Sequence, residues 1–409
     1  MRRLWRWAGG MALLATVIAG CQERLTSPAE CPELCPGGSA KVFDTLVVAA
    51  DLRDSSFTGY VARGQGTALL ASSGFAASED RAIYRFAPRG DSIAVRDTLH
   101  PYTVDSVAFR MNIVARDTLV NGLKVYLYRL PPTVDSTATF ADIDLQLSGA
   151  TLIDSIAVPD SVNTGSISKV VRSGDLGFAN VTLPPGGDSV LAIGLKIAAD
   201  SPTGIRLGTV ASSSAATFTS YVTVDVADTG SIRNQTLTRA TAFNTFVTQN
   251  PIVPVDSLLT VGGEPSSRAL VRFGLSNAFL DSTTIVRATL ELTPVQPIIG
   301  LPNDPSVLQA LAVIGDIGAK SPLTADATFI RQDTLPTVQS DTVRLEVTRL
   351  VQLWQSTRAR PQAIFLRLGP EAATYARAAF FSTRSHAGDT VVAPRLRITY
   401  QRSFPFENP

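Results

Sequence analysis

Histidine is nearly absent from the chain, with only His100 and His386 among 409 residues. A Ser-His-Asp triad would need one of them, and no Gly-x-Ser-x-Gly elbow is present to hold the serine. A zinc site needs clustered ligands at fixed spacing, which two distant histidines do not supply. Gly64-Gln65-Gly66 is too short for a nucleotide-binding loop. A glycosidase needs only two carboxylates, so a hydrolase stays open as a third hypothesis, but we expect a non-catalytic protein.

Lysine and tryptophan are also scarce, and the charge is nearly balanced. Only five of the 36 basic residues are lysines. Arginine recognises carboxylates bidentately, although a GC-rich genome produces the same bias. The formal net charge of +1 gives no reason to expect a nucleic-acid partner. Trp5 and Trp7 lie in the N-terminal segment, so Trp354 is the one tryptophan left for the rest of the chain. A single tryptophan provides little aromatic surface for stacking on neutral sugars.

The first of three cysteines closes an export signal. Three arginines precede an apolar run over 11–19, which is too short to span a bilayer. Ile18-Ala19-Gly20-Cys21 resembles the lipobox of bacterial lipoproteins. The resemblance implies that residues 1–20 are a signal peptide, that Cys21 is lipidated and that it anchors the protein to a membrane. Gln22 after the cysteine implies the outer membrane of a diderm cell envelope. A secretory peptide with a chance cysteine is the alternative.

Residues 21–40 are predicted to be the lipidated cysteine and a flexible tether, because proline and glycine recur there. The segment contains the other two cysteines, Cys31 and Cys35. An oxidising envelope permits a disulfide between them, with two free thiols as the alternative. No further Cys or His lies nearby, so no metal is expected.

From residue 41 onward the pattern is that of an all-β protein. Short β-branched and aromatic runs alternate with period two, as in 107–113 and 123–130, which indicates half-buried strands. Asp-Ser and Asp-Thr pairs recur beside these runs and are interpreted as turns, among them Asp44-Thr45, Asp105-Ser106 and Asp117-Thr118. They lack the spacing of calcium loops, so no cofactor is expected, while a structural calcium ion stays open without a supporting motif. One helical stripe appears at 345–354 and places Trp354 in the core.

The chain repeats itself at long range. Four segments recur in the same order: 81–86 with 268–273, 105–111 with 284–292, 190–196 with 363–368, and 216–221 with 378–383. Two tandem jelly-roll-like β-sandwich modules are therefore expected at 41–228 and 229–402, followed by a tail at 403–409.

The second copy resembles the DNRLRE family of bacterial surface modules. The resemblance rests on ordered segments that cover nearly all of 229–402: 258–263, 268–275, 285–292, 345–348, Trp354, 364–367, 381–384 and 394–400. The family's eponymous string is absent, and the first copy keeps only part of the pattern. The resemblance implies a jelly-roll sandwich and binding of polysaccharides, including uronic-acid polymers, through a basic strip.

The strand 268–273 suggests where that strip lies. Ala269, Val271 and Phe273 share one face, as a core stripe would, and Arg268, Leu270 and Arg272 share the other. Guanidinium groups hold sugar carboxylates bidentately. Arg367, Arg377 and Arg384 are further candidates for the strip. A solvated strand face paired with neighbouring acids is the alternative.

The sequence therefore predicts a surface lipoprotein that binds an acidic polysaccharide or another envelope polymer without catalysis. The alternative is a structural lipoprotein that pairs with other envelope proteins through exposed edge strands and binds no glycan.

Overall fold

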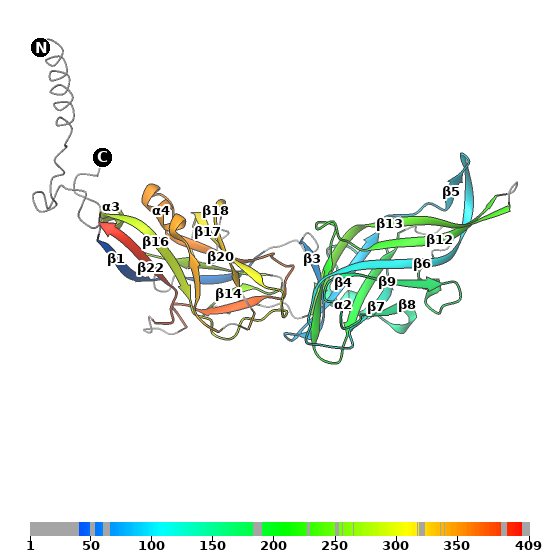
Figure 1. Cartoon of the computed structure of the whole chain (residues 1–409), viewed down its shortest axis with the longest axis horizontal. Coiled ribbons are helices and arrows are strands. Elements are labelled where there is room, and N and C mark those ends of the chain that lie inside the picture. The colour runs from blue at the N-terminus through cyan, green and yellow to red at the C-terminus, as the bar shows by residue number, and fades with distance from the viewer. Residues whose placement is uncertain are drawn as a thin grey trace, which may run out of the picture.

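The computed structural model describes residues 41–49, 54–59, 66–182, 190–226, 230–249, 253–255, 257–264, 266–316, 318, 324–335, 337–338, 340–385 and 391–402. These residues form strands β1 to β22 and a few short helices, so the all-β expectation is confirmed. The strands group into two β bodies that lie end to end (Figure 1), which we call the N-terminal lobe and the C-terminal lobe.

The N-terminal lobe is built on an 11-stranded sheet. Its main path is β13-β12-β6-β11-β3-β4-β10-β7-β8, and β5 and β9 both pair with β6. The strands are β3 (Ala68–Phe75), β4 (Ser78–Phe86), β5 (Ser92–Val95), β6 (Thr98–Arg116), β7 (Lys124–Leu130), β8 (Leu152–Ala157), β9 (Gly165–Arg172), β10 (Ala192–Ala198), β11 (Thr203–Gly208), β12 (Thr217–Val226) and β13 (Gly230–Thr248). Helices α2 (Phe140–Gln146), η1 (Gly149–Thr151) and η2 (Phe178–Asn180) complete the lobe.

The C-terminal lobe contains two sheets. A four-stranded sheet has the order β1-β22-β16-β19, and a seven-stranded sheet has the order β18-β17-β20-β15-β14-β21 with β2 added to β15. The strands are β1 (Val42–Val48), β2 (Ser55–Thr58), β14 (Leu258–Gly262), β15 (Ser267–Arg272), β16 (Thr283–Leu292), β17 (Ser306–Gly315), β18 (Thr324–Leu335), β19 (Val343–Glu346), β20 (Ala363–Gly369), β21 (Arg377–Phe381) and β22 (Arg395–Arg402). The helices are α3 (Asn277–Ser282) and α4 (Thr348–Ser356). One apolar cluster with residues from both sheets fills the space between them, as in a β-sandwich.

Strand alternation explains the two faces of β15. Ala269 and Val271 belong to the main core of the sandwich, whereas Leu270 is buried in a second cluster on the opposite face, with Phe365. The predicted helix at 345–354 corresponds to α4, although its first two residues lie in β19. Helix α4 covers the sandwich with Leu350, Val351 and Trp354 buried. Trp354 is only 2% exposed and lies against Phe273, with ring centroids 6.2 Å apart. It is therefore a core residue.

The aspartate pairs are only partly turns. The side chain of Asp117 accepts a hydrogen bond from the backbone N–H of Leu119, as an Asp turn requires. Asp44 and Asp105 instead lie inside β1 and β6, where they accept hydrogen bonds from Thr399 and Thr223 of neighbouring strands. The interpretation of these two residues as turns is wrong. A threonine hydroxyl on the adjacent strand donates the hydrogen bond to each carboxylate that a backbone N–H would donate in a turn.

The strand pairing divides the chain differently from the expected boundary at 228/229. Strands β1 and β2 come first in the chain but lie in the C-terminal lobe, where Val42 pairs with Gln401 and Ser55 with Leu270. Strand β13 follows the expected boundary but lies in the N-terminal lobe, where Ala240 pairs with Thr217 and Thr241 with Phe86. Alternation in the sequence specifies which face of a strand is buried, but it does not determine which other strand pairs with it.

The same pairing order occurs in both lobes, which supports the internal repeat. The order β8-β7-β10-β4 in the N-terminal lobe matches β18-β17-β20-β15, and β12-β6-β9 matches β22-β16-β19. Strand β13 pairs with both β12 and β4, and the matching positions in the C-terminal lobe are filled by β1 on β22 and β2 on β15. Strand β12 therefore corresponds to β22 in pairing order. The sequence repeat had instead aligned 216–221, at the start of β12, with 378–383. In each lobe, these positions are filled by strands from the other side of the expected boundary at 228/229.

Polar and aromatic contacts join the lobes. Arg206 on β11 forms an ion pair with Asp304, with Nη1 and Oδ1 2.5 Å apart. Tyr375 packs edge-on against Phe75 and donates a hydrogen bond to the carbonyl oxygen of Ile205. Asp80 and Glu264 meet in the same region.

Candidate ligand-binding groove

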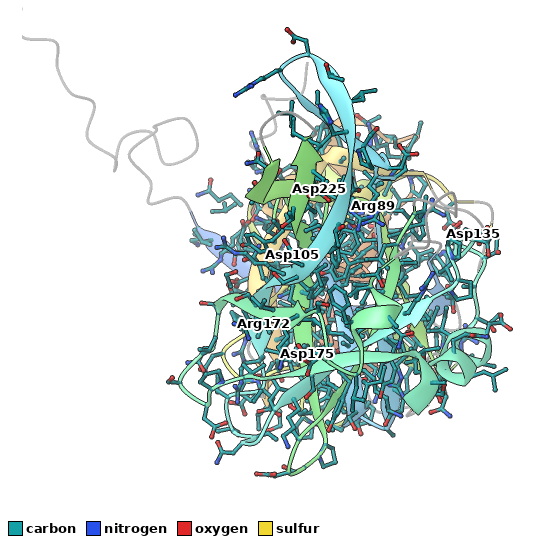
Figure 2. The ribbon with its side chains drawn as sticks, turned by 90° about the vertical axis from the view of Figure 1, so that its right-hand side faces the viewer. Arg89, Asp105, Asp135, Arg172, Asp175 and Asp225 are labelled. Atoms are coloured by element: carbon teal, nitrogen blue, oxygen red, sulfur yellow. The ribbon has the colours of Figure 1, made fainter. Side chains whose placement is uncertain are left out.

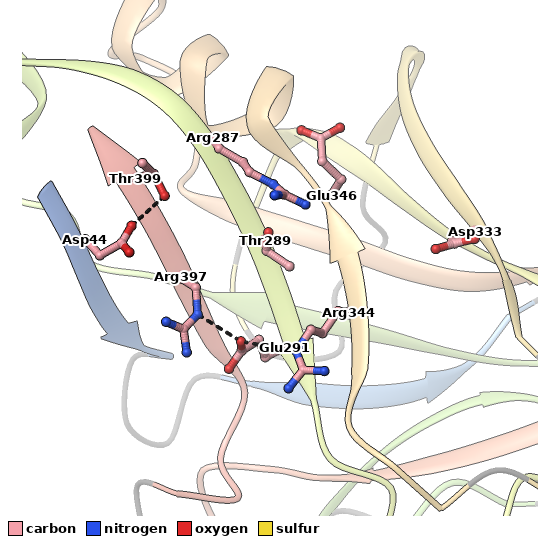
Figure 3. Close-up of a pocket in the computed structure, with 9 residues that line it drawn as sticks. All are labelled: Asp44, Arg287, Thr289, Glu291, Asp333, Arg344, Glu346, Arg397 and Thr399. Atoms are coloured by element: carbon pink, nitrogen blue, oxygen red, sulfur yellow. Dashed lines mark hydrogen bonds and ion pairs between the residues drawn. The ribbon is translucent and has the colours of Figure 1, made fainter. Parts of the chain in front are cut away.

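The outward face of the four-stranded sheet is lined with charged and hydroxyl side chains. On β16, Ala288, Leu290 and Leu292 are fully buried, so the residues between them point to the opposite face of the sheet. Registered neighbours on the other strands extend this face, with Thr289 opposite both Arg397 and Glu346. The face is hollowed into a groove of about 550 Å³, which we call the basic groove after the arginine cluster at one of its ends. It is lined by Asp44, Arg287, Thr289, Glu291, Asp333, Arg344, Glu346, Arg397 and Thr399 (Figure 3).

One buried carboxylate organises the arginines at one end of the groove. Glu291 is 2% exposed, and its oxygens lie 2.7 Å from Nε of Arg395, 3.2 Å from Nε of Arg397 and 3.6 Å from Nε of Arg344. Burial opposes ionisation of Glu291, but hydrogen bonds from Arg395 and Arg397 outweigh it and lower its pKa. Three guanidinium groups around one carboxylate leave two positive charges in excess.

The arginines of this cluster keep donors available to a ligand. The side chain of Arg344 is 66% exposed and that of Arg397 is 48% exposed. Each guanidinium has five N–H donors, of which a contact with Glu291 uses only some. Because Glu291 holds the three groups in place, a ligand loses less conformational freedom when it binds them.

Acceptors lie along the rest of the groove. Glu346 accepts a hydrogen bond from the backbone N–H of Thr348 at 2.9 Å. Burial opposes its ionisation, but the bonds from Thr348 and the charges of Arg331 and Arg287 lower its pKa. Asp44 accepts a hydrogen bond from Thr399 across β1 and β22 (Figure 3). Carboxylate acceptors and threonine hydroxyls beside arginines form a surface that can bind both the hydroxyls and the acid groups of a polymer.

Four of the arginines expected to form a binding strip have carboxylates of the chain as partners. Arg268 makes a bidentate contact with Glu371, at 2.7 and 3.0 Å, and Arg367 also contacts Glu371 at 3.2 Å. Arg272 makes a bidentate contact with Asp316 at 2.6 and 2.7 Å. Arg384 donates to the carbonyl oxygen of Asp54 and lies 3.9 Å from its carboxylate.

The structure thus joins Arg268 and Arg367 through Glu371, and gives Arg272 and Arg384 separate partners. This arrangement matches the alternative in which neighbouring acids pair with the strand. Leu270, which lies between the two arginines of β15, is buried and does not face water. We therefore move the candidate site to the basic groove.

The arginines of the groove have a signal in the sequence. In Arg395-Leu396-Arg397-Ile398-Thr399, apolar and polar residues alternate, and the same alternation places Arg287, Thr289 and Glu291 on one face. Their convergence on Glu291 depends on strand pairing across more than a hundred residues, because Glu291 and Arg395 are 104 positions apart.

Other expected features fall outside or beside this site. Cys21, Cys31, Cys35 and His386 lie outside the described residues. Within the part of the chain that the structure describes, no group of three or more His, Cys, Asp or Glu side chains is placed to hold a metal ion. None of the helices in that part is long and apolar enough to cross a bilayer.

The far end of the N-terminal lobe displays charges of both signs, among them Arg89, Arg172, Asp105, Asp135, Asp175 and Asp225 (Figure 2).

No family model matches the chain, and no curated protein matches it significantly. The resemblance to DNRLRE modules therefore stays a prediction.

Proposed function

We propose that this protein is a non-catalytic, lipid-anchored protein of the bacterial cell envelope that binds an acidic polysaccharide in the basic groove. The observation that supports this most directly is the cluster of Arg344, Arg395 and Arg397 around the single carboxylate of Glu291. The positive charge of this cluster favours an anion at its end of the groove, whereas the lining as a whole, with three arginines and four acids, is nearly balanced. The open groove suits a chain that passes through it.

The chemistry of the lining favours a uronic-acid polymer over a neutral one. A guanidinium binds a sugar carboxylate with two parallel hydrogen bonds. Thr289, Thr399 and the acidic side chains supply partners for ring hydroxyls. Trp354, the main candidate for stacking on a sugar ring, is buried in the core. Stacking on it therefore contributes nothing to the affinity for a polysaccharide.

The test is binding of polygalacturonate to the full chain in detergent, with dextran as the neutral comparison polymer. Arg344→Ala combined with Arg397→Ala should weaken binding of polygalacturonate by about tenfold or more, because each charge-assisted hydrogen bond contributes roughly 1.5–3 kcal/mol. Raising the salt concentration should weaken binding as well.

Arg349→Ala is the matched control, because Arg349 is exposed on α4 and does not line the groove. It should leave the affinity unchanged. Equal affinity of the double variant and the native chain for polygalacturonate would show that the groove is not the binding site. Equal binding of dextran and polygalacturonate would show that the ligand need not be acidic.

A scaffold role is the second candidate, and strand β1 favours it. Strand β1 is an edge of the four-stranded sheet, and Val42 and Leu46 on it are 54% and 48% exposed. An edge strand with exposed apolar residues can accept a strand from another protein. Leu46→Lys should abolish capture of an envelope partner by this edge. Because Leu46 lies opposite Arg397, the added cation should not weaken binding of polygalacturonate.

A further inference from the structure

Two carboxyl groups that the binding proposal does not use meet where the lobes join. Asp80 lies on β4 of the N-terminal lobe, and Glu264 follows β14 of the C-terminal lobe. Asp80 is fully buried and Glu264 is 4% exposed. The two carboxyl groups interact with each other, and Oδ1 of Asp80 is buried with no hydrogen-bond donor from the described residues on it. We call the two residues the junction pair.

The other hydrogen-bond partners of the junction pair are neutral hydroxyls. Ser72 donates to Oδ2 of Asp80 at 2.5 Å. Thr248 on β13 and Ser78 on β4 contact Oε2 of Glu264 at 3.3 and 3.5 Å. Hydroxyl donors stabilise one negative charge, and they do not neutralise two.

The cations around the junction pair are engaged elsewhere or only approach it. Arg81, next to Asp80, bonds to Glu79 at 2.8 Å and to Asp144 at 2.9 Å. Arg206 on β11 is paired with Asp304. Arg377 on β21 interacts electrostatically with Glu264, and the phenol of Tyr375 faces both acids and is uncharged.

A hydrogen bond between two carboxyl groups requires a proton on one of them, since two carboxylates offer only acceptors. Two ionised carboxylates in contact would also repel each other strongly at this buried position. Burial raises the pKa of both groups, and the charge of Asp80 raises that of Glu264 further, well above 4.5.

We propose that Asp80 and Glu264 share one proton and form a pH-sensitive contact that holds the two lobes together. When the proton is lost as the pH rises through the folded-state pKa, two negative charges face each other across the junction, and the lobes separate locally. The hydroxyls of Ser72, Ser78 and Thr248 then lose their fixed partners.

The direction of the pH effect follows from the raised pKa values. In the unfolded chain Glu264 titrates near 4.5, and in the folded chain it titrates well above that value. The stability supplied by the shared proton is therefore fully present below pH 4.5, and it is lost as the pH rises through the folded-state pKa.

Infrared difference spectroscopy of the full chain in detergent tests the proton directly. We expect a protonated carboxylic-acid band that persists after the exposed acids have ionised, disappears as the pH is raised further, and is absent when Glu264→Gln and Asp80→Asn are combined. Glu346→Gln, which changes an exposed acid, should leave the band in place. A native spectrum without the band, or a band that survives in the double variant, would overturn the proposal.

Hydrogen exchange followed by mass spectrometry tests the junction. After correction for intrinsic rates, protection of 72–80 and 262–267 should fall about tenfold for each pH unit above the folded-state pKa. Glu264→Gln keeps a hydrogen-bonding side chain without its charge, so its protection should stay constant with pH. The shared-proton proposal would be contradicted if protection fell equally with pH in Glu264→Gln and in the native chain. It would also be contradicted if calcium ions raised the protection, because a bound cation would then explain the contact.

Discussion

The carboxylate of Asp54 accepts two hydrogen bonds from Thr383, one from its backbone N–H at 2.7 Å and one from its hydroxyl at 2.8 Å. The two residues are 329 positions apart, and Asp54 is 1% exposed. Together with β1 and β2, this contact fixes the first described segment of the chain in the C-terminal lobe.

Replacing Asp54 should therefore destabilise the C-terminal lobe. Asp54→Ala leaves the N–H and hydroxyl of Thr383 without their acceptor in a buried site, at an expected cost of about 3 kcal/mol in the free energy of unfolding. Urea unfolding followed by the fluorescence of Trp354 measures it. Asp44→Ala, on the exposed face of β1, should cost about 0.5 kcal/mol or less. Similar losses in the two variants would show that the buried contact contributes little.

Glu291 should make the basic groove sensitive to acid. Its folded-state pKa is lowered below 4.5, so the stability it contributes is present above pH 4.5 and is lost as the pH falls through the folded-state value. Glu291→Gln should flatten this acid limb of the stability curve, measured by thermal unfolding at stepped pH. An acid limb of unchanged slope would contradict the role assigned to Glu291.

Trp354 should act through stability and not through ligand contact. Trp354→Ala removes a large side chain from the core beneath α4 and should cost about 3–5 kcal/mol. Trp354→Phe, the conservative control, should keep the fold and bind polygalacturonate with native affinity in the same titration. A loss of affinity in the folded Phe variant would place the indole in the binding site.

Strand β13 should be essential to the N-terminal lobe. Phe246 and Val247 on this strand are buried, with exposures of 1% and 0%. A fragment of residues 66–249 should unfold cooperatively in a thermal scan, whereas residues 41–228 should bind a hydrophobic dye and lack a sharp transition. A sharp transition in 41–228 would mean that β1 and β2 can occupy the position of β13.

Periodicity predicted the parts of this fold that depend on local pattern. Alternation in 268–273 identified the core face of β15, and the spacing of Leu350, Val351 and Trp354 identified α4. The placement of β1 and β2 in the C-terminal lobe and of β13 in the N-terminal lobe has no local signal, because it depends on contacts between segments far apart in the chain.

The site was predictable in the same partial way. Alternation showed that Arg268 and Arg272 share a face, but Glu371 and Asp316, which pair with them, lie 103 and 44 positions away. The opposite outcome in the basic groove, where three arginines share one acid, arises from the order of the strands. The sequence therefore indicated arginine-based recognition, and the fold determined which arginines remain open to a ligand.

The pairing of β1 with β22 has a mechanical consequence. Val42 lies opposite Gln401, so the two ends of the described chain leave the molecule side by side, far from the tip of the N-terminal lobe (Figure 1). A force that pulls residue 41 away from residue 402 peels β1 from β22 one residue pair at a time. The N-terminal lobe, inserted between β2 and β14, lies outside the load path until both β1 and β2 have detached.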